Sequence, residues 1–288
     1  MSNFQYLVDK INNASFINVP FKHIYLENFF NENHIAEIKQ ATEINVPKFS
    51  SSKDMIDTLS STYNYDPHPF PGCTTNVKNY LHWLDSGEIH KGIKKDQELL
   101  EGFGIALRLE SYKTTLLEEL IDFFNSIEWH TCLKEKFEKT GHTKVDTAIQ
   151  KYLTGYEISP HPDIRRKCLT YMININPSDE SENLNLHTYF MELVENKKWI
   201  YRYWAENLDT ERCWIPWDWA SPCFNQKKNN SITVFAPTDD TIHAVKLNYD
   251  HCKFQRTQFY GNLWYSPTQL KPSSWKDLEQ IGNGWRFE

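Results

Sequence analysis

The sequence contains no run of about 18 apolar residues, the length that a membrane-spanning helix needs, so we expect no membrane span. The N-terminal stretch MSNFQYLVDKINNASF lacks a basic segment followed by an apolar core, and we therefore expect no secretory signal peptide. Six cysteines are scattered along the chain without a C-x-x-C pair, which argues against a zinc knuckle and a disulfide framework. Together these absences predict a cytoplasmic protein with reduced thiols.

An excess of basic residues is also missing. The chain has 31 Lys and Arg against 38 Asp and Glu, a formal net charge of −7, whereas nucleic-acid binders usually carry a basic face. We therefore expect no nucleic-acid partner. A length of 288 residues is enough to bury a substantial core, and no internal repeat divides the chain. The expectation is one domain over residues 1–288.

The first half of the chain shows a few helical signals and long irregular stretches. Alternation predicts a strand over 19–30, and Asn31 is a capping residue that predicts a short helix after it. Residues 44–75 carry little periodicity, so they indicate an irregular excursion. Apolar residues at three-and-four spacing predict one long helix over 116–137.

From Thr147 onward the chain is typical of β-structure. Short segments rich in β-branched and aromatic residues are bounded by turn formers. They cover 148–153, 168–176, 183–190, 230–236, 242–248 and 256–266. Six such segments without intervening helices predict an antiparallel sandwich or jelly roll. The fold class expected is α+β, mainly β, with N-terminal helices packed on a double-stranded β-helix.

His161 and Asp163 are separated only by Pro162, just before the apolar segment 168–176. In an extended chain they project from the same face, and the proline suits the edge of a sheet. An imidazole and a carboxylate so placed can occupy neighbouring positions around one metal ion. Alone, this spacing is a weak signal, because most such pairs are exposed polar residues.

Two further residues strengthen the signal. His243 lies near the start of the segment 242–248. Arg256 begins the segment 256–266, where alternation puts Arg256 and Gln258 on one face. An arginine pointing into an aromatic-rich barrel is costly unless an anion meets it, and its planar guanidinium suits a carboxylate. Two histidines and one carboxylate are the ligand set of non-haem Fe(II) oxygenases.

At this point the sequence resembles the Fe(II)- and 2-oxoglutarate-dependent dioxygenases, in particular their prolyl-4-hydroxylase-like branch. VPFKHIYLENFFNENH is similar to the first strand and helix of that branch, and LLEELIDFFNSIEWHTCLKEKFEKTG to its long supporting helix. YLTGYEISPHPD resembles the approach to the first two ligands, and KCLTYMININP the strand after them. TVFAPTDDTIHAV and RTQFYGNLWY resemble the last two strands of the site. The resemblance covers most of the chain outside 44–110 and 188–230.

The resemblance implies a role for six residues. It implies that His161, Asp163 and His243 bind Fe(II), and that Arg256 pairs with the distal carboxylate of 2-oxoglutarate. Tyr152 and Thr257 are weaker candidates to hydrogen-bond the same carboxylate. The gap from His243 to Arg256 is longer than the family pattern, which leaves Lys246 and Lys253 as alternatives. Lys246 is expected to face away from His243, and Lys253 to lie in a turn.

The implied reaction uses 2-oxoglutarate and O₂ as co-substrates and releases succinate and CO₂. The implied product is a hydroxylated C–H position, with desaturation or ring closure as alternatives. The substrate is a small molecule or a peptidyl residue, and the excursions 44–110 and 188–230 are expected to cover it. The rival function is a jelly-roll module that binds a ligand without turnover; the intact ligand trio argues against it.

Other conspicuous residues have plainer explanations. His187 follows a strand and is the histidine most easily mistaken for a ligand. Arg165, Arg166 and Lys167 are expected to form a solvated rim, with guidance of an anionic substrate as the minority interpretation. The tryptophans of the segment 188–230 are expected to cover the core, or else to form an aromatic wall over the substrate.

Overall fold

The computed structural model describes residues 3–68, 76–87 and 102–266. Its α-helices there are α1 (Gln5–Asn13), α2 (Glu32–Gln40), α3 (Ser52–Tyr63), α4 (Val77–Ser86), α5 (Thr115–Phe124), α6 (Ile127–Lys136) and α7 (Trp199–Glu206). Three short 3₁₀-helices are η1 (Asp179–Asn183), η2 (Glu195–Lys197) and η3 (Trp217–Trp219).

The strands form two antiparallel sheets. They are β1 (His23–Glu27), β2 (Tyr65–Pro67), β3 (Ala106–Leu109), β4 (Thr143–Tyr152), β5 (Glu157–His161), β6 (Lys167–Asn174), β7 (Thr188–Leu193), β8 (Ala220–Asn225), β9 (Ser231–Phe235), β10 (His243–Lys246) and β11 (Arg256–Tyr265). The larger sheet has the order β1-β9-β6-β11-β4-β3-β2, and the smaller has the order β5-β10-β7-β8.

The eight strands from β4 to β11 make a double-stranded β-helix. Strands β4, β6, β9 and β11 lie in the larger sheet, while β5, β7, β8 and β10 lie in the smaller, so the chain passes repeatedly between them. Two four-stranded sheets wound in this way are a jelly roll. Strand β1 extends the larger sheet on one side, and β3 and β2 extend it on the other. The predicted fold class is confirmed.

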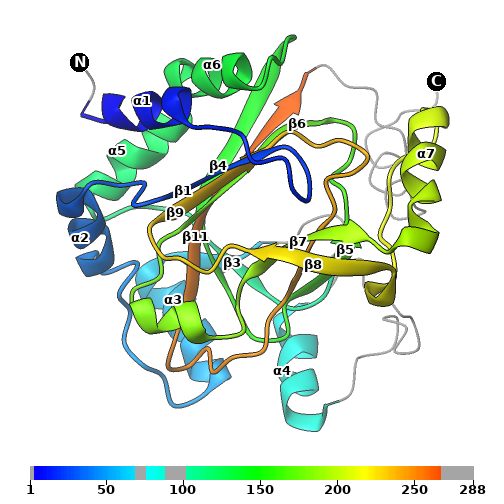
Figure 1. The fold of residues 1–288 in the computed structure, drawn as a ribbon. Coiled ribbons are helices and arrows are strands. Elements are labelled where there is room, and N and C mark those ends of the chain that lie inside the picture. Colours follow the sequence, from blue (N-terminus) through cyan, green and yellow to red (C-terminus); the bar gives the residue numbers. More distant parts are fainter. Residues whose placement is uncertain (1–2, 69–75, 88–101, 267–288) are drawn as a thin grey trace, which may run out of the picture.

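The N-terminal helices cover the outer face of the larger sheet, as Figure 1 shows for α1, α2, α5 and α6. Aromatic rings make the contact: Phe124 of α5 lies 5.2 Å from Phe259 of β11, and Trp129 of α6 lies 5.7 Å from Tyr171 of β6. Because side chains alternate along a strand, the neighbours of Phe259 and Tyr171 point to the other face of the sheet, into the space between the sheets. The helices therefore fix which residues of β4, β6 and β11 face the interior of the jelly roll.

Several predicted elements differ from the structure. The single helix expected over 116–137 is two helices, α5 and α6, because Ser126 caps α6 by accepting a hydrogen bond from Trp129 N. The stretch 44–75 was expected to be irregular, but its described part, 44–68, contains α3 and β2, and Ser51 caps α3. The strand expected over 19–30 is limited to β1, which pairs with β9, a strand expected within 230–236. The helix after Asn31 is confirmed as α2, with the Asn31 side chain as its cap.

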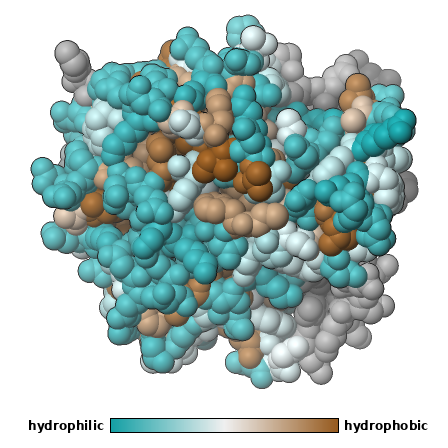
Figure 2. Space-filling model, viewed as in Figure 1, coloured by the Kyte–Doolittle hydropathy of each residue, from teal (hydrophilic) through white to brown (hydrophobic). Residues whose placement is uncertain are grey.

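The surface is largely hydrophilic on the face shown in Figure 2, with an apolar area near its centre. Ile17 and Val19, in the segment before β1, are among the large apolar side chains that remain exposed, at 40% and 68%. Within the described ranges, every helix is too short or too polar to reach across a bilayer.

Candidate metal centre and adjoining cavity

His161, Asp163 and His243 come together although 80 residues separate the first two from the third. His161 is the last residue of β5 and lies directly opposite His243, the first residue of β10, in an antiparallel pair. Their rings are 4.4 Å apart between centroids. Asp163 follows β5 by two residues, and its Oδ1 lies 3.9 Å from His243 Nε2. One ligand atom from each side chain lies within 4.8 Å of the others.

Both imidazoles are oriented by the backbone in the same way. His161 Nδ1 lies 2.8 Å from the Ser159 carbonyl oxygen, and His243 Nδ1 lies 2.9 Å from the Thr241 carbonyl oxygen. A carbonyl only accepts hydrogen bonds, so each Nδ1 carries the proton. The Nε2 atoms then present their lone pairs, which is the arrangement that metal-binding histidines usually have.

Asp163 is held by two partners. Lys167 Nζ donates to its Oδ1 at 2.7 Å, and Thr170 Oγ1 donates to its Oδ2 at 2.7 Å. An ionised carboxylate has about four lone-pair sites, so each oxygen retains capacity for a metal ion. The two bonds fix the orientation of the carboxylate toward His243.

The protonation states of the three side chains suit a cation. Burial, together with the neighbouring His243, lowers the pKa of His161 to about 3, and burial also lowers the pKa of His243. Burial alone would raise the pKa of Asp163, but the ammonium group of Lys167 outweighs it, and this pKa lies below its usual range. At neutral pH the cluster therefore offers two neutral imidazoles and one carboxylate, the forms that bind metals.

This donor set fits an Fe(II) ion. Two imidazole nitrogens and one carboxylate leave coordination positions for other ligands, as in the facial triad of non-haem iron sites. In the described part of the chain, no fourth His, Cys, Asp or Glu joins the cluster. The predicted metal residues are thus placed together by the structure.

A cavity of about 300 Å³ adjoins the cluster, between the two sheets. Arg256, the first residue of β11, lines the same cavity and is 3% exposed. Its Nη2 donates to Thr188 Oγ1 at 2.8 Å, and within the described residues no carboxylate lies within ion-pair distance of it. Burial lowers the pKa of Arg256 because desolvation disfavours its charged form. A buried guanidinium without a counter-charge is costly, and it is satisfied when an anion enters the cavity.

Tyr152 and Thr257 occupy different faces of the larger sheet. Tyr152 pairs with Arg256 across β4 and β11, and its ring lies 4.5 Å from the Arg256 guanidinium, on the cavity side. Thr257 points to the opposite face, where its Oγ1 accepts a hydrogen bond from the buried Lys151 Nζ. Thr257 does not line the cavity, which removes it from the candidates for binding 2-oxoglutarate. Side chains alternate between the two faces of a strand, so the position of Thr257 directly after Arg256 already places these two residues on opposite faces.

The alternatives to Arg256 and to the ligand histidines lie elsewhere. Lys246 and Lys253 are exposed and form ion pairs with Glu157 and Asp250, respectively. His187 is buried, but its Nε2 lies 3.2 Å from the Glu182 carbonyl oxygen, outside the metal cluster.

The expected solvated rim of Arg165, Arg166 and Lys167 is wrong. Lys167 is 7% exposed and paired with Asp163, because a bulge in the β6–β11 pairing shifts the register at this residue. Arg166 lines the cavity and lies 5.0 Å from the Trp264 ring. A bulge leaves no pattern in the sequence, so the role of Lys167 could not be predicted.

The tryptophans of the segment 188–230 divide between the two expected roles. Trp204 is 2% exposed in a small core with β7 and β10, while Trp199 on the same helix is 57% exposed. Trp214 lines the cavity, 6.2 Å from the His161 ring. In the other excursion, 44–110, His68 also lines the cavity.

No protein-family model and no curated protein matches the sequence. The chain is structurally similar to prolyl hydroxylases. A Pseudomonas putida prolyl-4-hydroxylase has a TM-score of 0.44 and 8% identity, over 90% of this chain and 97% of that one. A Trichoplax adhaerens prolyl hydroxylase, solved with a hypoxia-inducible-factor peptide, has a TM-score of 0.41 and 11% identity, over 92% of each chain.

AviO1 from Streptomyces viridochromogenes Tue57 has a TM-score of 0.40 and 10% identity, over 94% of this chain and 99% of that one. With so little shared sequence, function has to be argued from the residues of the site itself.

Proposed function

We propose that the protein is an Fe(II)- and 2-oxoglutarate-dependent dioxygenase that hydroxylates a C–H bond of a small molecule or a peptidyl residue. The balanced reaction is R–H + O₂ + 2-oxoglutarate → R–OH + succinate + CO₂. The observation that supports it is one cavity holding both a two-histidine, one-carboxylate cluster and a buried arginine without a counter-charge.

Each residue has a distinct task in this proposal. His161, Asp163 and His243 hold the iron, and the bound iron supplies the oxidation chemistry with O₂ and 2-oxoglutarate. Arg256 binds the distal carboxylate of 2-oxoglutarate, and its hydrogen bond to Thr188 Oγ1 keeps the guanidinium oriented toward the cavity. The Tyr152 ring packs against the guanidinium and shields this ion pair from water.

The burial of Arg256 explains why the co-substrate would bind firmly. A charge-assisted pair in a site closed to water is stronger than a surface pair, because water does not compete for the donors. Without an anion, the buried charge of Arg256 destabilises the folded state. Binding of an anion should therefore raise the free energy of unfolding.

The test uses anaerobic Fe(II) and 2-oxoglutarate with the full chain. We expect a weak visible charge-transfer band, and, in air, slow succinate formation that a substrate accelerates. His161→Ala should abolish the band. Arg256→Gln should raise the 2-oxoglutarate concentration needed for the band by at least ~10-fold, since a charge-assisted bond is lost.

His187→Ala is the matched control, because His187 is also a buried histidine near the cavity but lies outside the cluster. It should retain the band and the succinate formation. A protein that shows no band, or a band that survives His161→Ala, would refute the proposal.

A further inference from the structure

Two arginines besides Arg256 line the cavity, Arg166 and Arg212, and the proposed reaction uses neither of them. Arg212 is 4% exposed and lies in the irregular segment between α7 and η3. This segment is fastened beside the metal cluster, because Ile215 N donates to the Pro160 carbonyl oxygen, next to His161 in β5. Arg212 is therefore held at the same cavity as the candidate iron ligands.

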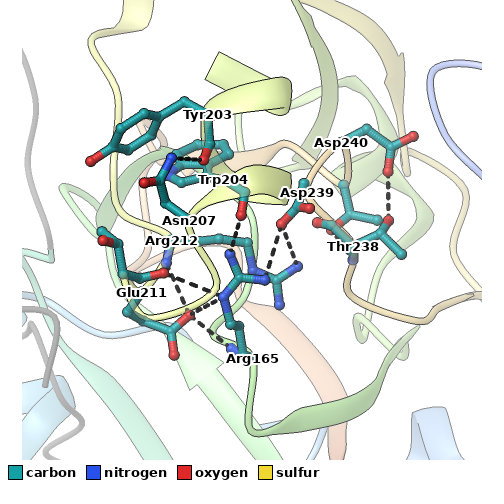
Figure 3. Close-up of polar contacts among 11 residues, drawn as sticks. Arg165, Tyr203, Trp204, Asn207, Glu211, Arg212, Thr238, Asp239 and Asp240 are labelled. Atoms are coloured by element: carbon teal, nitrogen blue, oxygen red, sulfur yellow. Dashed lines mark hydrogen bonds and ion pairs between the residues drawn. The ribbon is translucent and has the colours of Figure 1, made fainter. Parts of the chain in front are cut away.

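A polar network positions Arg212, as Figure 3 shows. Glu211 Oε1 accepts hydrogen bonds from the backbone N–H groups of Arg165 and Arg212, at 3.0 and 2.9 Å. Asp239 Oδ1 lies 3.4 Å from Arg165 Nη1 and 3.7 Å from Arg212 Nη1. Arg165 Nη2 also donates to the Trp204 carbonyl oxygen at 2.7 Å. The network uses the hydrogen-bonding capacity of Arg165 and leaves that of Arg212 largely unused.

Arg212 and Trp214 both line the cavity, and both carry side-chain N–H groups without acceptors. Among the described residues, no acceptor takes a hydrogen bond from the Arg212 side chain, and its Nε is buried without a partner. The 3.7 Å separation from Asp239 is an ion pair without a hydrogen bond. Trp214 Nε1 is likewise buried without a partner, and Trp214 lines the same cavity. Buried N–H groups without acceptors are rare and costly in folded proteins.

The carboxylates of the cavity do not satisfy these donors. Asp146 forms a 2.7 Å ion pair with Arg108, and Asp163 is paired with Lys167 and belongs to the metal cluster. These are the only carboxylates among the described residues that line the cavity. Apart from the 3.7 Å ion pair with Asp239, Arg212 thus keeps donors that an anion entering the cavity can use.

We infer that the substrate carries an oxyanion group, a carboxylate or a phosphate, which Arg212 and the Trp214 N–H bind beside the metal cluster. This rests on the proposed function for the identity of the molecule as a substrate. The group is held near the reacting carbon, because the Trp214 ring lies 6.2 Å from the ring of His161. A cavity of about 300 Å³ is at the small end for ligand sites, and a small organic acid or phosphate ester fits it.

The first experiment measures anion binding without metal or activity. Inorganic phosphate and, separately, acetate are titrated calorimetrically into the metal-free full chain. The single variant Arg256→Gln should retain one anion site. The double variant Arg256→Gln/Arg212→Gln should bind the anion at that site at least ~10-fold more weakly, because one charge-assisted hydrogen bond is lost. Arg202→Gln in place of Arg212→Gln is the control, because Arg202 is exposed on α7 and paired with Glu206.

Two further variants separate binding from folding. Arg212→Lys keeps the charge and should retain part of the affinity, while Trp214→Phe keeps the ring, removes only the N–H donor, and should weaken binding about 5-fold. Unchanged affinity in both Arg212→Gln and Trp214→Phe would overturn the inference. Because no iron or 2-oxoglutarate is present, these outcomes do not depend on whether the proposed reaction occurs.

The second experiment identifies the anion. A panel of small carboxylic acids, phosphate esters and neutral analogues is screened for accelerated succinate release. The class of compound that accelerates the release shows whether the anionic group is a carboxylate or a phosphate. For the best compound, Arg212→Gln should raise KM at least ~10-fold. Stimulation by neutral compounds alone, or an equal rise in the KM for 2-oxoglutarate, would refute the assignment of Arg212 to the substrate.

Discussion

The free energy of unfolding of the wild-type protein should rise between pH 7 and pH 9. Replacing Lys151 with methionine should remove this rise. Lys151 lies on β4, between cavity-lining Gln150 and Tyr152, but points to the opposite face and is completely buried. Its Nζ donates to the Ile44 carbonyl oxygen at 3.0 Å and to Thr257 Oγ1 at 2.9 Å. Within the described residues no carboxylate pairs with it, and burial lowers its pKa from 10.5 to about 7.

The sign follows from the two pKa values. Above pH 7 the amine is neutral in the folded state, whereas in the unfolded state it stays protonated up to about pH 10.5. The unfolded state binds more protons throughout this window, so the free energy of unfolding increases with pH. For one group titrating between these limits, the increase from pH 7 to pH 9 is about 2 kcal/mol.

Urea unfolding of the wild type and of Lys151→Met at pH 6, 7, 8 and 9 measures this effect. The difference between the two stability curves isolates Lys151 from every other titrating group. We expect that difference to change by about 2 kcal/mol from pH 7 to pH 9, and less from pH 6 to pH 7. Lys144→Met, at an exposed position of the same strand, should run parallel to the wild type. Parallel curves for wild type and Lys151→Met would show that the buried amine does not titrate in this range.

Three other substitutions test the fold. Gly261→Ala places a Cβ within 2.0 Å of the buried Tyr171 ring and should lower the free energy of unfolding by ~1–3 kcal/mol; an unchanged urea midpoint would contradict this packing. Glu43→Ala leaves the backbone N–H groups of Lys113 and Thr114 without their carboxylate and should cost about 2–3 kcal/mol at pH 7. Burial alone would raise the pKa of Glu43, but these bonds lower it, so the difference from wild type should shrink as the pH falls below 4.5; a constant difference would count against it. Asn31→Ala removes the cap of α2 and should cost about 1 kcal/mol, which thermal unfolding would detect and which an unaltered Tm would exclude.

The buried ion pair between Lys167 and Asp163 fixes the charge and the orientation of the carboxylate in the candidate metal centre. Lys167 neutralises the buried carboxylate of Asp163 through a 2.7 Å ion pair. Its ammonium also lies 5.3 Å from the Trp264 ring, at the wall of the cavity. The candidate metal centre is therefore already organised, because the carboxylate and both imidazoles have fixed orientations.

Local sequence pattern determined much of this protein. Alternation along β11 placed Arg256 and Gln258 on the cavity face, and the same alternation, applied one residue further, places Thr257 outside it. The capping residue Asn31 marked the start of α2, and the short segments after Thr147 identified a jelly roll. Each of these signals depends on a period of two or on a few neighbouring residues, which the sequence shows directly.

The tertiary structure decided what depends on pairing between distant segments. The antiparallel register of β5 and β10 brings His161 opposite His243, and a bulge between β6 and β11 turns Lys167 inward toward Asp163. Arg212 lies at the cavity because a hydrogen bond ties its irregular segment to β5 and contacts with Glu211 and Asp239 hold it there. Register, bulges and loop attachment are set by the sum of many contacts across the chain, and no local pattern of residues records them.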